Sequence, residues 1–467
     1  MKKFNVKYHV LAPLTLIAVL YLWFVPADML GIAGLTVIQQ RTIAIFCYAA
    51  LMWMFEIIPA WATSVSTIVF LLLAVSNKGL TSEEMGSLVN FKELMAAFAD
   101  PIIMLFLGGF VLAIAASKVG LDVYLARIML KPFGTNPKYV LLGFLTIISV
   151  MSMFMSNTAT AAMMLAFLAP VLKNLPADGG GRVSLAMAIP IAANVGGLGT
   201  PIGTPPNAIA IGQLAQMDIN IGFGAWMLRM VPVVIVMIFI SWRLLMYLYP
   251  FKAKSIEINI QGECNRDWKF WTVTVTFLFT ILLWMTGEIT HLNSNVVALI
   301  PFAVFAVVGI FTRDDFAKID WHVLWMVAGG FALGTALNKT GLAEALVEAI
   351  PFASWSAIAV LIIAGLLGWI LSNFIANSSA ANLLVPILAV VGTAMGENLG
   401  AFGGVTTLLV CVAASTSFAM LFPISTPPNA IACSTGLIKT PEMMKVGLII
   451  GLVGIAISYA VMLLFPF

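Results

Sequence analysis

The sequence predicts an all-α polytopic membrane protein with the inverted-repeat organisation of a secondary transporter. Its 467 residues are 61% hydrophobic and only 9% charged, whereas soluble domains are about 25% charged. The apolar residues fall in runs of roughly 20, the helix length that crosses a bilayer. Both halves carry the same polar, proline-containing motifs, which is typical of transporters whose binding site lies between two repeats.

Three motifs occur twice, in the same order and at nearly the same spacing. The repeated segments are Gly108–Phe110 with Gly329–Phe331, Phe154–Ala162 with Phe374–Asn382, and Pro201–Ala210 with Pro423–Ala432. Their offsets are 221, 220 and 222 residues, which indicates a duplicated chain. We expect an N-terminal transmembrane helix in 1–35, a first repeat in 36–250, a cytoplasmic loop in 251–268 and a second repeat in 269–467.

The composition disfavours several other classes of protein. The net charge of +3 is small, and the basic residues lie in loops rather than in one patch, so no nucleic-acid partner is expected. The four cysteines and three histidines show no spacing typical of disulfides or of a zinc site. An intramembrane enzyme is disfavoured because the polar centres contain neither a His-Glu-x-x-His motif nor a nucleophile paired with a base.

Eleven apolar runs predict transmembrane helices. They lie near 10–27, 40–57, 60–76, 101–117, 185–215, 222–248, 269–288, 295–312, 323–338, 403–433 and 443–465. The first run could pass for a signal peptide, but no small-residue cleavage site follows it, so we interpret it as a crossing. Lys2, Lys3 and Lys7 place the N-terminus in the cytoplasm, and an odd number of crossings places Phe467 outside. The expected location is the plasma (inner) membrane.

Two further apolar segments have a polar interruption near the middle. The segment at about 138–175 is interrupted at 156–158, and the segment at about 355–398 is interrupted at 372–379. A second arm of about 14 residues, or roughly 21 Å of helix, is too short to cross. Polar backbone at membrane depth must be buried in protein or line a wet cavity. We therefore expect two re-entrant hairpins that enter from opposite sides.

Each half also contains Thr-Pro-Pro-Asn inside a long apolar run, at 204–207 and at 426–429. Threonine suits a helix N-cap and proline suits the first helical turn, so this motif is a helix start. We expect the helices at about 185–215 and 403–433 to unwind at their centres and restart there.

These breaks would bring four helix N-termini to the middle of the membrane. Each N-terminus carries roughly half a positive charge and free N–H groups, which suit a carboxylate. The carbonyl ends of the preceding helices and nearby Ser, Thr and Asn oxygens suit a small hard cation such as sodium. No Asp, Glu, Lys or Arg lies at the breaks, so bound cations would have to offset an anion. Such side chains often only join membrane helices, but their recurrence in both halves favours a site.

On these motifs the chain resembles the divalent anion/sodium symporter family, the dicarboxylate and citrate transporters, over essentially its whole length. That family has two Ser-Asn-Thr motifs at hairpin tips and two Pro-Pro-Asn unwound loops. The resemblance implies a homodimer in which a scaffold domain holds the dimer interface. A transport domain with both hairpins and both broken helices would move as an elevator.

The resemblance also implies the residues of the site. One sodium ion would be held by Ser152, Ser156, Asn157 and the backbone of Gly203. A second would be held by Ser372, Asn377 and the backbones of Ile375 and Ser425. The substrate would meet Ser156, Asn157, Thr158, Thr204, Asn377, Ser378, Thr426 and Pro427. The chain departs from the family at Ala376-Asn377-Ser378, where the family reads Ser-Asn-Thr, so that one hydroxyl is lost.

The resemblance implies a sodium-coupled symporter of C4-dicarboxylates such as succinate, malate and fumarate. One alternative is an exchanger of dicarboxylates or citrate that does not require sodium. An alternative from a different class is an anion channel, which would share the polar midplane but needs an open path. The expected partners are a small dicarboxylate anion, sodium, the lipid bilayer and a second copy of the chain.

Overall fold

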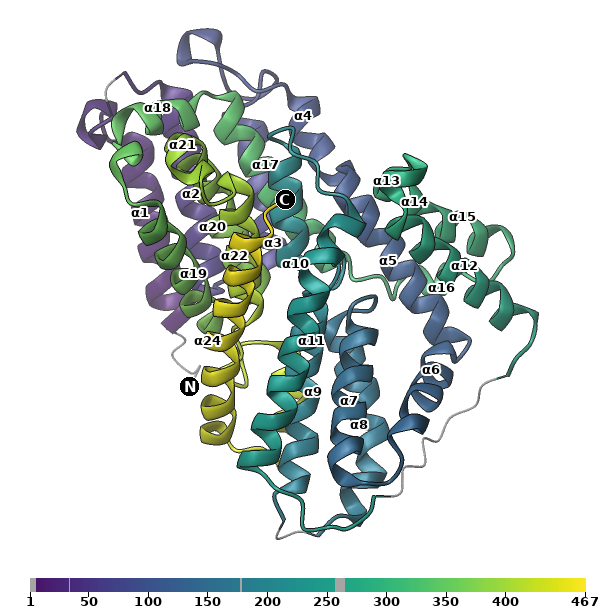
Figure 1. The fold of residues 1–467 in the computed structure, drawn as a ribbon. Coiled ribbons are helices and arrows are strands. Elements are labelled where there is room, and N and C mark those ends of the chain that lie inside the picture. Colours follow the sequence, from purple (N-terminus) through teal and green to yellow (C-terminus); the bar gives the residue numbers. More distant parts are fainter. Residues whose placement is uncertain (1–5, 33, 177–178, 257–264) are drawn as a thin grey trace.

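The computed structural model describes residues 6–32, 34–176, 179–256 and 265–467, which form a bundle of helices (Figure 1). The described part of the chain contains no β-sheet, and its one isolated bridge joins Ser76 to Val89. Lys2 and Lys3, which support the predicted cytoplasmic N-terminus, lie outside the described residues, as does Cys264.

Most of the described residues lie in helices. In the first half they are α1 (Ala12–Phe24), α2 (Val37–Phe55), α3 (Ala60–Ala74), α4 (Phe91–Ala96), α5 (Pro101–Lys118), α6 (Leu121–Leu130), α7 (Pro137–Ser152), α8 (Asn157–Asn174), α9 (Gly181–Gly197), α10 (Pro205–Ala215) and α11 (Phe223–Leu248). In the second half they are α12 (Trp268–Met285), α13 (Gly287–Thr290), α14 (Ser294–Val297), α15 (Leu299–Val307), α16 (Arg313–Phe316), α17 (Trp321–Lys339), α18 (Leu342–Ala349), α19 (Ala357–Phe374), α20 (Asn377–Met395), α21 (Glu397–Gly400), α22 (Gly404–Ser417), α23 (Pro427–Ser434) and α24 (Thr440–Leu464).

Eight helical segments of the described chain are long and apolar enough to cross a membrane, which confirms an all-α polytopic protein. Several predicted crossings are shorter or divided: α3 has only 15 residues, and the runs 185–215 and 403–433 each form two helices. The predicted hairpin arms α19 and α20 are longer than expected, with 18 and 19 residues, and belong to the eight. The number of crossings therefore stays a prediction.

Helix interruptions occur at all four predicted motifs. The residues between the paired helices are 153–156, 198–204, 375–376 and 418–426. The segments 138–175 and 355–398 thus each contain two helices joined by a short turn, and most of the polar residues lie in the adjoining helix ends. The Thr-Pro-Pro motifs begin α10 and α23, as their capping chemistry predicts. The inverted relation of the two repeats stays a prediction.

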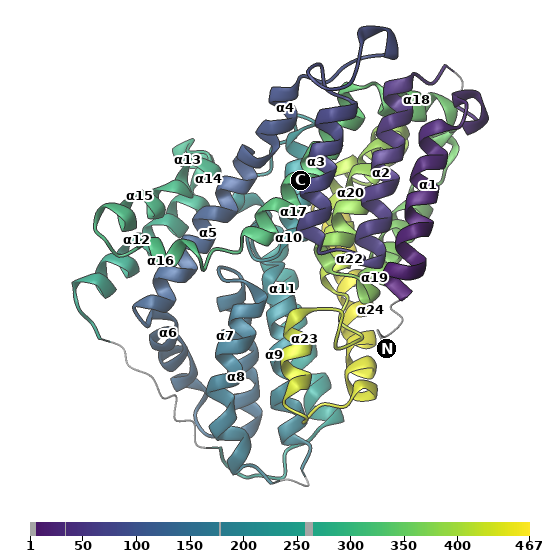
Figure 2. The same cartoon turned by 180° about the vertical axis from the view of Figure 1, so that it is seen from behind.

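The second piece of each broken helix packs in the other half of the chain. Helix α10 contacts α20 and α22, and helix α23 contacts α8 and α9. Figure 2 shows α23 beside these two helices of the first half. Helix α10 of the first half thus packs among helices of the second half, and helix α23 of the second half packs among helices of the first. This exchange brings the four interruptions close together.

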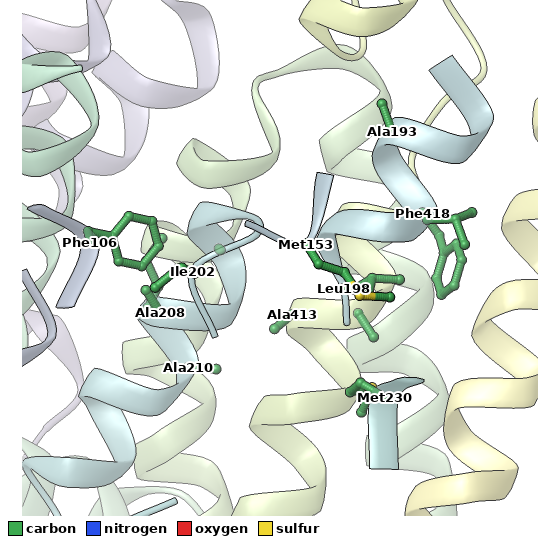
Figure 3. Close-up of a cluster of buried hydrophobic side chains, with 14 of the residues drawn as sticks. Phe106, Met153, Ala193, Leu198, Ile202, Ala208, Ala210, Met230, Ala413 and Phe418 are labelled. Atoms are coloured by element: carbon green, nitrogen blue, oxygen red, sulfur yellow. The ribbon is translucent and has the colours of Figure 1, made fainter. Parts of the chain in front are cut away.

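Apolar side chains surround the interruptions (Figure 3). Leu198 and Phe418, which directly follow α9 and α22, are fully buried. The duplicated Gly-Gly-Phe motif allows close helix contacts: a Cβ on Gly108 would lie 2.1 Å from the carbonyl oxygen of Ala298. On Gly329 it would lie 2.4 Å from the Cβ of Ser64. A larger residue at either glycine would therefore push two helices apart.

Two lysines that end equivalent helices form ion pairs with the opposite half. Lys118, the last residue of α5, lies 2.5 Å from Asp315, which precedes α17. Lys339, the last residue of α17, lies 3.5 Å from Glu93, which precedes α5. Asp315 is buried, whereas Glu93 is exposed. The two pairs link the halves in a reciprocal way, and the buried one is expected to contribute more stability.

We predict that Asp315→Asn lowers thermal stability at pH 7. Burial raises the pKa of Asp315, but hydrogen bonds from Lys118, Lys318 and Thr312 outweigh it and hold that pKa well below its usual range. A carboxyl with a lowered folded pKa stabilises fully above its unfolded pKa of about 4 and loses this effect as pH falls through the folded value. The substitution should cost roughly 1–2 kcal/mol, read as a lower Tm in detergent. Asp314→Asn, at the exposed neighbouring residue, is the control. If the two variants have equal Tm values, Asp315 does not stabilise the fold through these contacts.

Candidate functional site

The four interruptions line one cavity of about 420 Å³. Ten of the predicted site residues lie in its wall: Ser156, Asn157, Thr158, Gly203, Thr204, Asn377, Ser378, Ser425, Thr426 and Pro427. The remaining three, Ser152, Ser372 and Ile375, are buried outside the cavity wall. The structure therefore brings residues from both halves together at one polar cavity.

A buried serine supports the asparagine at each tip in the same way. Ser152 Oγ lies 2.6 Å from the Asn157 amide and 2.7 Å from the carbonyl oxygen of Ala193. Ser372 Oγ lies 2.8 Å from Asn377 Oδ1 and 2.8 Å from the carbonyl oxygen of Thr416. A hydroxyl has one proton and can donate to only one of its two neighbours. Each tip therefore gathers more oxygen atoms than one serine proton can satisfy.

Three oxygen atoms surround one end of the Asn157 amide. One atom of its side-chain amide lies 3.1 Å from the Gly203 carbonyl oxygen, 2.6 Å from Ser152 Oγ and 3.1 Å from the Ala193 carbonyl oxygen. These partners are satisfied when the amide nitrogen faces them, or when Oδ1 faces them and a cation lies between. Amide, hydroxyl and carbonyl oxygens suit a hard cation. No cluster of three or more His, Cys, Asp or Glu side chains in the described ranges could hold a metal ion.

The helix N-termini offer fewer N–H groups than we expected from the sequence. The first two residues of both α10 and α23 are prolines, which have no N–H. The next N–H is also used, because Asn207 donates to the carbonyl oxygen of Thr204 at 3.2 Å and Asn429 donates to Thr426 Oγ1 at 3.3 Å. These two N-termini therefore contribute threonine hydroxyls and a helix dipole rather than free backbone donors.

Free backbone donors come instead from α8 and α20. At α8 the Ser156 hydroxyl accepts from Ala159 N–H at 3.2 Å. The N–H groups of the first two residues of α8, Asn157 and Thr158, have no partner within the helix. At α20 the N-cap is Ala376, whose side chain cannot accept a hydrogen bond. The departure from Ser-Asn-Thr at this position therefore leaves the first turn of α20 uncapped, with its N–H groups available to an anion.

Asn207 and Asn429 hold the two unwound loops in shape. Asn207 Nδ2 donates to the carbonyl oxygens of Gly197 and Thr200 at 3.0 and 2.8 Å. Asn429 Nδ2 donates to two carbonyl oxygens of the other loop at 3.1 and 2.9 Å. Both asparagines belong to the repeated Thr-Pro-Pro-Asn motif but were not among the predicted site residues. Their exact repetition was the signal that could have identified them.

Two other asparagines were also missed by the sequence analysis. Asn373 Oδ1 accepts from Leu421 N–H at 2.8 Å, and the Asn373 carbonyl oxygen accepts from Ser425 Oγ at 2.9 Å. Asn194, in α9, lines the cavity. Asn373 lies in the polar interruption predicted at 372–379, which was the available signal, whereas Asn194 is a single amide in an otherwise apolar stretch.

Within the part of the chain that the structure describes, no positive side chain lies in the wall of this cavity. Among the described residues that line it, the charged ones are Glu56 and Asp320, both about half exposed. A larger cavity of about 820 Å³ adjoins it, shares Ser156 and Asp320, and reaches Lys118. An anion at the tips would therefore meet neutral donors, with two carboxylates nearby.

Comparison with known proteins identifies related transporters. Residues 50–403 match a family described as "CitMHS: Citrate transporter". The chain is 28% identical to the sodium-dependent dicarboxylate transporter SdcS of Staphylococcus saprophyticus, covering 98% of this chain and 92% of that protein. It is 27% identical to the sodium-dependent high-affinity dicarboxylate transporter 3 of Caenorhabditis elegans, covering 87% and 79%. An uncharacterized transporter of Schizosaccharomyces pombe is 29% identical, and the chain spans about half (48%) of its length.

Two solved structures share the fold. The YdaH transporter of Alcanivorax borkumensis matches with a TM-score of 0.55 at 12% identity, covering 91% of this chain and 98% of that one. MtrF of Neisseria gonorrhoeae matches with a TM-score of 0.54 at 12% identity, covering 87% and 95%. At this identity the likeness concerns the arrangement of the helices alone.

We predict that Asn207→Ala and Asn429→Ala each lower the free energy of unfolding. Either change leaves two carbonyl oxygens in an unwound loop without their donor, at a cost of roughly 1–3 kcal/mol. Thermal melting in detergent measures the effect. Asn338→Ala, at an exposed asparagine of α17, is the control. If both loop variants have the same Tm as this control, the two asparagines do not stabilise the loops.

Proposed function

The chain belongs to the citrate transporter family, and from this we propose that it is a sodium-coupled symporter of C4-dicarboxylates such as succinate, malate and fumarate. The single observation that carries the proposal is one cavity lined by the neutral polar side chains of both tips and both unwound loops. Relatives named as sodium-dependent dicarboxylate transporters support the choice of ion and substrate.

The two carboxylates of the substrate match two sources of backbone donors. One carboxylate would meet the N-terminus of α8 with Asn157 and Thr158. The other would meet the uncapped N-terminus of α20 with Asn377 and Ser378. The hydroxyls of the two loop threonines and the ring of one proline complete the set of contacts, which are Thr204, Thr426 and Pro427. Because the donors come from both halves, an anion with two separated carboxylates fits better than a monocarboxylate.

Sodium would supply the positive charge that the cavity wall lacks. The first ion would be bound by oxygens of Ser152, Ser156, Asn157 and Gly203, and the second by oxygens of Ser372, Ile375, Asn377 and Ser425. Moving a dianion from water into a site without cations is costly, and Glu56 and Asp320 would increase the cost. Bound sodium offsets this cost, which gives a physical reason for coupled transport.

We propose that transport follows the elevator scheme of an inverted repeat. The moving unit would contain α7 to α10 and α19 to α23, and the remaining helices would form the scaffold and the interface of a homodimer in the plasma membrane. The N-terminus would be cytoplasmic and the C-terminus outside. The larger cavity reaches Lys118 and Lys318, which the loop charges assign to the cytoplasmic side. This opening supports an inward-facing state.

A sodium-independent exchanger of dicarboxylates or citrate is the second candidate. The observation that favours it is Ala376 at the second tip, because a lost hydroxyl weakens polar contacts near the second cation. An exchanger would use the same cavity, but its transport domain would move back across the membrane only with a substrate bound. Saturable flux that internal substrate stimulates would exclude an anion channel.

The test is uptake of labelled succinate into proteoliposomes with sodium or choline outside, and with or without unlabelled succinate or malate inside. Sodium-dependent accumulation into empty vesicles is the expected result. Uptake that ignores sodium and appears only with internal dicarboxylate would make the chain an exchanger. Uptake without saturation would favour a channel.

We predict that Asn157→Ala and Asn377→Ala each reduce sodium-driven uptake by about 100-fold or more. Each removes an amide that serves both the anion and a cation, so two interactions are lost together. Size-exclusion chromatography should show that both variants remain folded and dimeric. Asn338→Ala is the matched control. If either variant shows normal uptake, the tip that carries the substituted asparagine is not part of the binding site.

A further inference from the structure

Asn194 joins the two halves of the chain at the cavity. It lies in α9 of the first half, lines the cavity and is only 1% exposed. Its Nδ2 lies 3.1 Å from Oγ1 of Thr426 and 3.4 Å from Oδ1 of Asn429, both in the second half. The amide therefore reaches the loop threonine that begins α23.

The contacts of Thr426 fix the direction of its hydroxyl proton. Its Oγ1 accepts from Asn194 Nδ2 at 3.1 Å and from Asn429 N–H at 3.3 Å. A hydroxyl has two acceptor positions and one proton, so both acceptor positions are occupied by these donors. Within the described ranges no protein acceptor takes the proton, and Thr426 lines the cavity. The proton is thus left for a ligand.

The other end of the Asn194 amide argues against a purely structural role. Its Oδ1 is buried and has no hydrogen-bond partner among the described residues. A buried acceptor without a partner destabilises a fold, and an apolar residue of similar size would avoid that cost. The Asn194 amide therefore lowers the stability of the fold through Oδ1 and orients the Thr426 hydroxyl through Nδ2.

The equivalent position in the other half lacks this contact. Thr416 lies 222 residues after Asn194 and donates locally to the carbonyl oxygen of Ala413 at 2.9 Å. Thr204, the counterpart of Thr426, makes no side-chain capping bond. The two loop threonines therefore differ: one hydroxyl is oriented by two donors and the other is not.

We propose that Asn194 is a positioning residue for the anion, acting through Thr426. It holds the Thr426 hydroxyl so that the hydroxyl donates its proton to a carboxylate oxygen of the bound dicarboxylate. This inference rests on the proposed function and adds a specificity-determining residue to it. The side of the cavity near α23 would then bind its carboxylate more tightly than the side near α10.

The test measures KM and Vmax for succinate uptake, and Tm, for Asn194→Ala, Asn194→Asp, Thr426→Ala and the double variant Asn194→Ala with Thr426→Ala. Asn194→Ala should raise KM about ten-fold, the loss of one charge-assisted hydrogen bond, with little change in Vmax and no fall in Tm. Asn194→Asp should raise KM further, because a carboxylate takes the Thr426 proton and repels the anion. Adding Asn194→Ala to Thr426→Ala should change KM no further.

Ser184→Ala is the matched control. Ser184 lies in the same helix, is fully buried and also has an oxygen without a partner, but it does not line the cavity. Its removal should leave KM unchanged. A wild-type KM in Asn194→Ala, additive effects in the double variant, or a marked fall in Tm of Asn194→Ala would each overturn the inference. If the wild-type protein shows no saturable succinate uptake, the proposed function fails, and this inference fails with it.

Discussion

Four helix interruptions inside apolar segments leave backbone N–H and C=O groups that lipid cannot satisfy. The protein must therefore supply hydrogen-bond partners for these groups. Two loops are held by the amides of Asn207 and Asn429, and two tips are held by Ser152 and Ser372. The exchange of α10 and α23 packs the second piece of each broken helix against helices of the other half. The first two residues of α8 and of α20 line one cavity, where a ligand can accept hydrogen bonds from their N–H groups.

The chemistry of that cavity follows from which groups remain. Prolines remove the N–H groups at α10 and α23, so the free donors belong to α8 and α20. Three oxygens surround one end of the Asn157 amide, and the charged residues in the described wall are both acidic. A site with neutral donors, two nearby carboxylates and no lysine or arginine among its described wall residues binds a dianion well only when cations bind with it. In the proposed function, this is the origin of coupling to sodium.

Much of the site could be predicted from sequence because the duplicated motifs place polar and helix-starting residues at fixed positions. Ser156 caps α8 and Thr426 caps α23, as local capping chemistry indicates. Hydropathy alone could not give the helix lengths at α19 and α20, because the polar residues of the interruption predicted at 372–379 continue both helices up to a turn of only two residues, 375–376. The contact of Asn194 with Thr426 was also beyond the sequence, because it joins residues 232 positions apart through tertiary packing.

The central claim is that the anion and the cations stabilise each other in one cavity that offers no positive side chain among its described wall residues. Its most direct test is calorimetric titration of the purified protein with succinate at several sodium concentrations, and with sodium at several succinate concentrations. The account predicts that sodium lowers the Kd of succinate and that succinate lowers the Kd of sodium by the same factor, as thermodynamic linkage requires. A succinate Kd that does not change with sodium would contradict it.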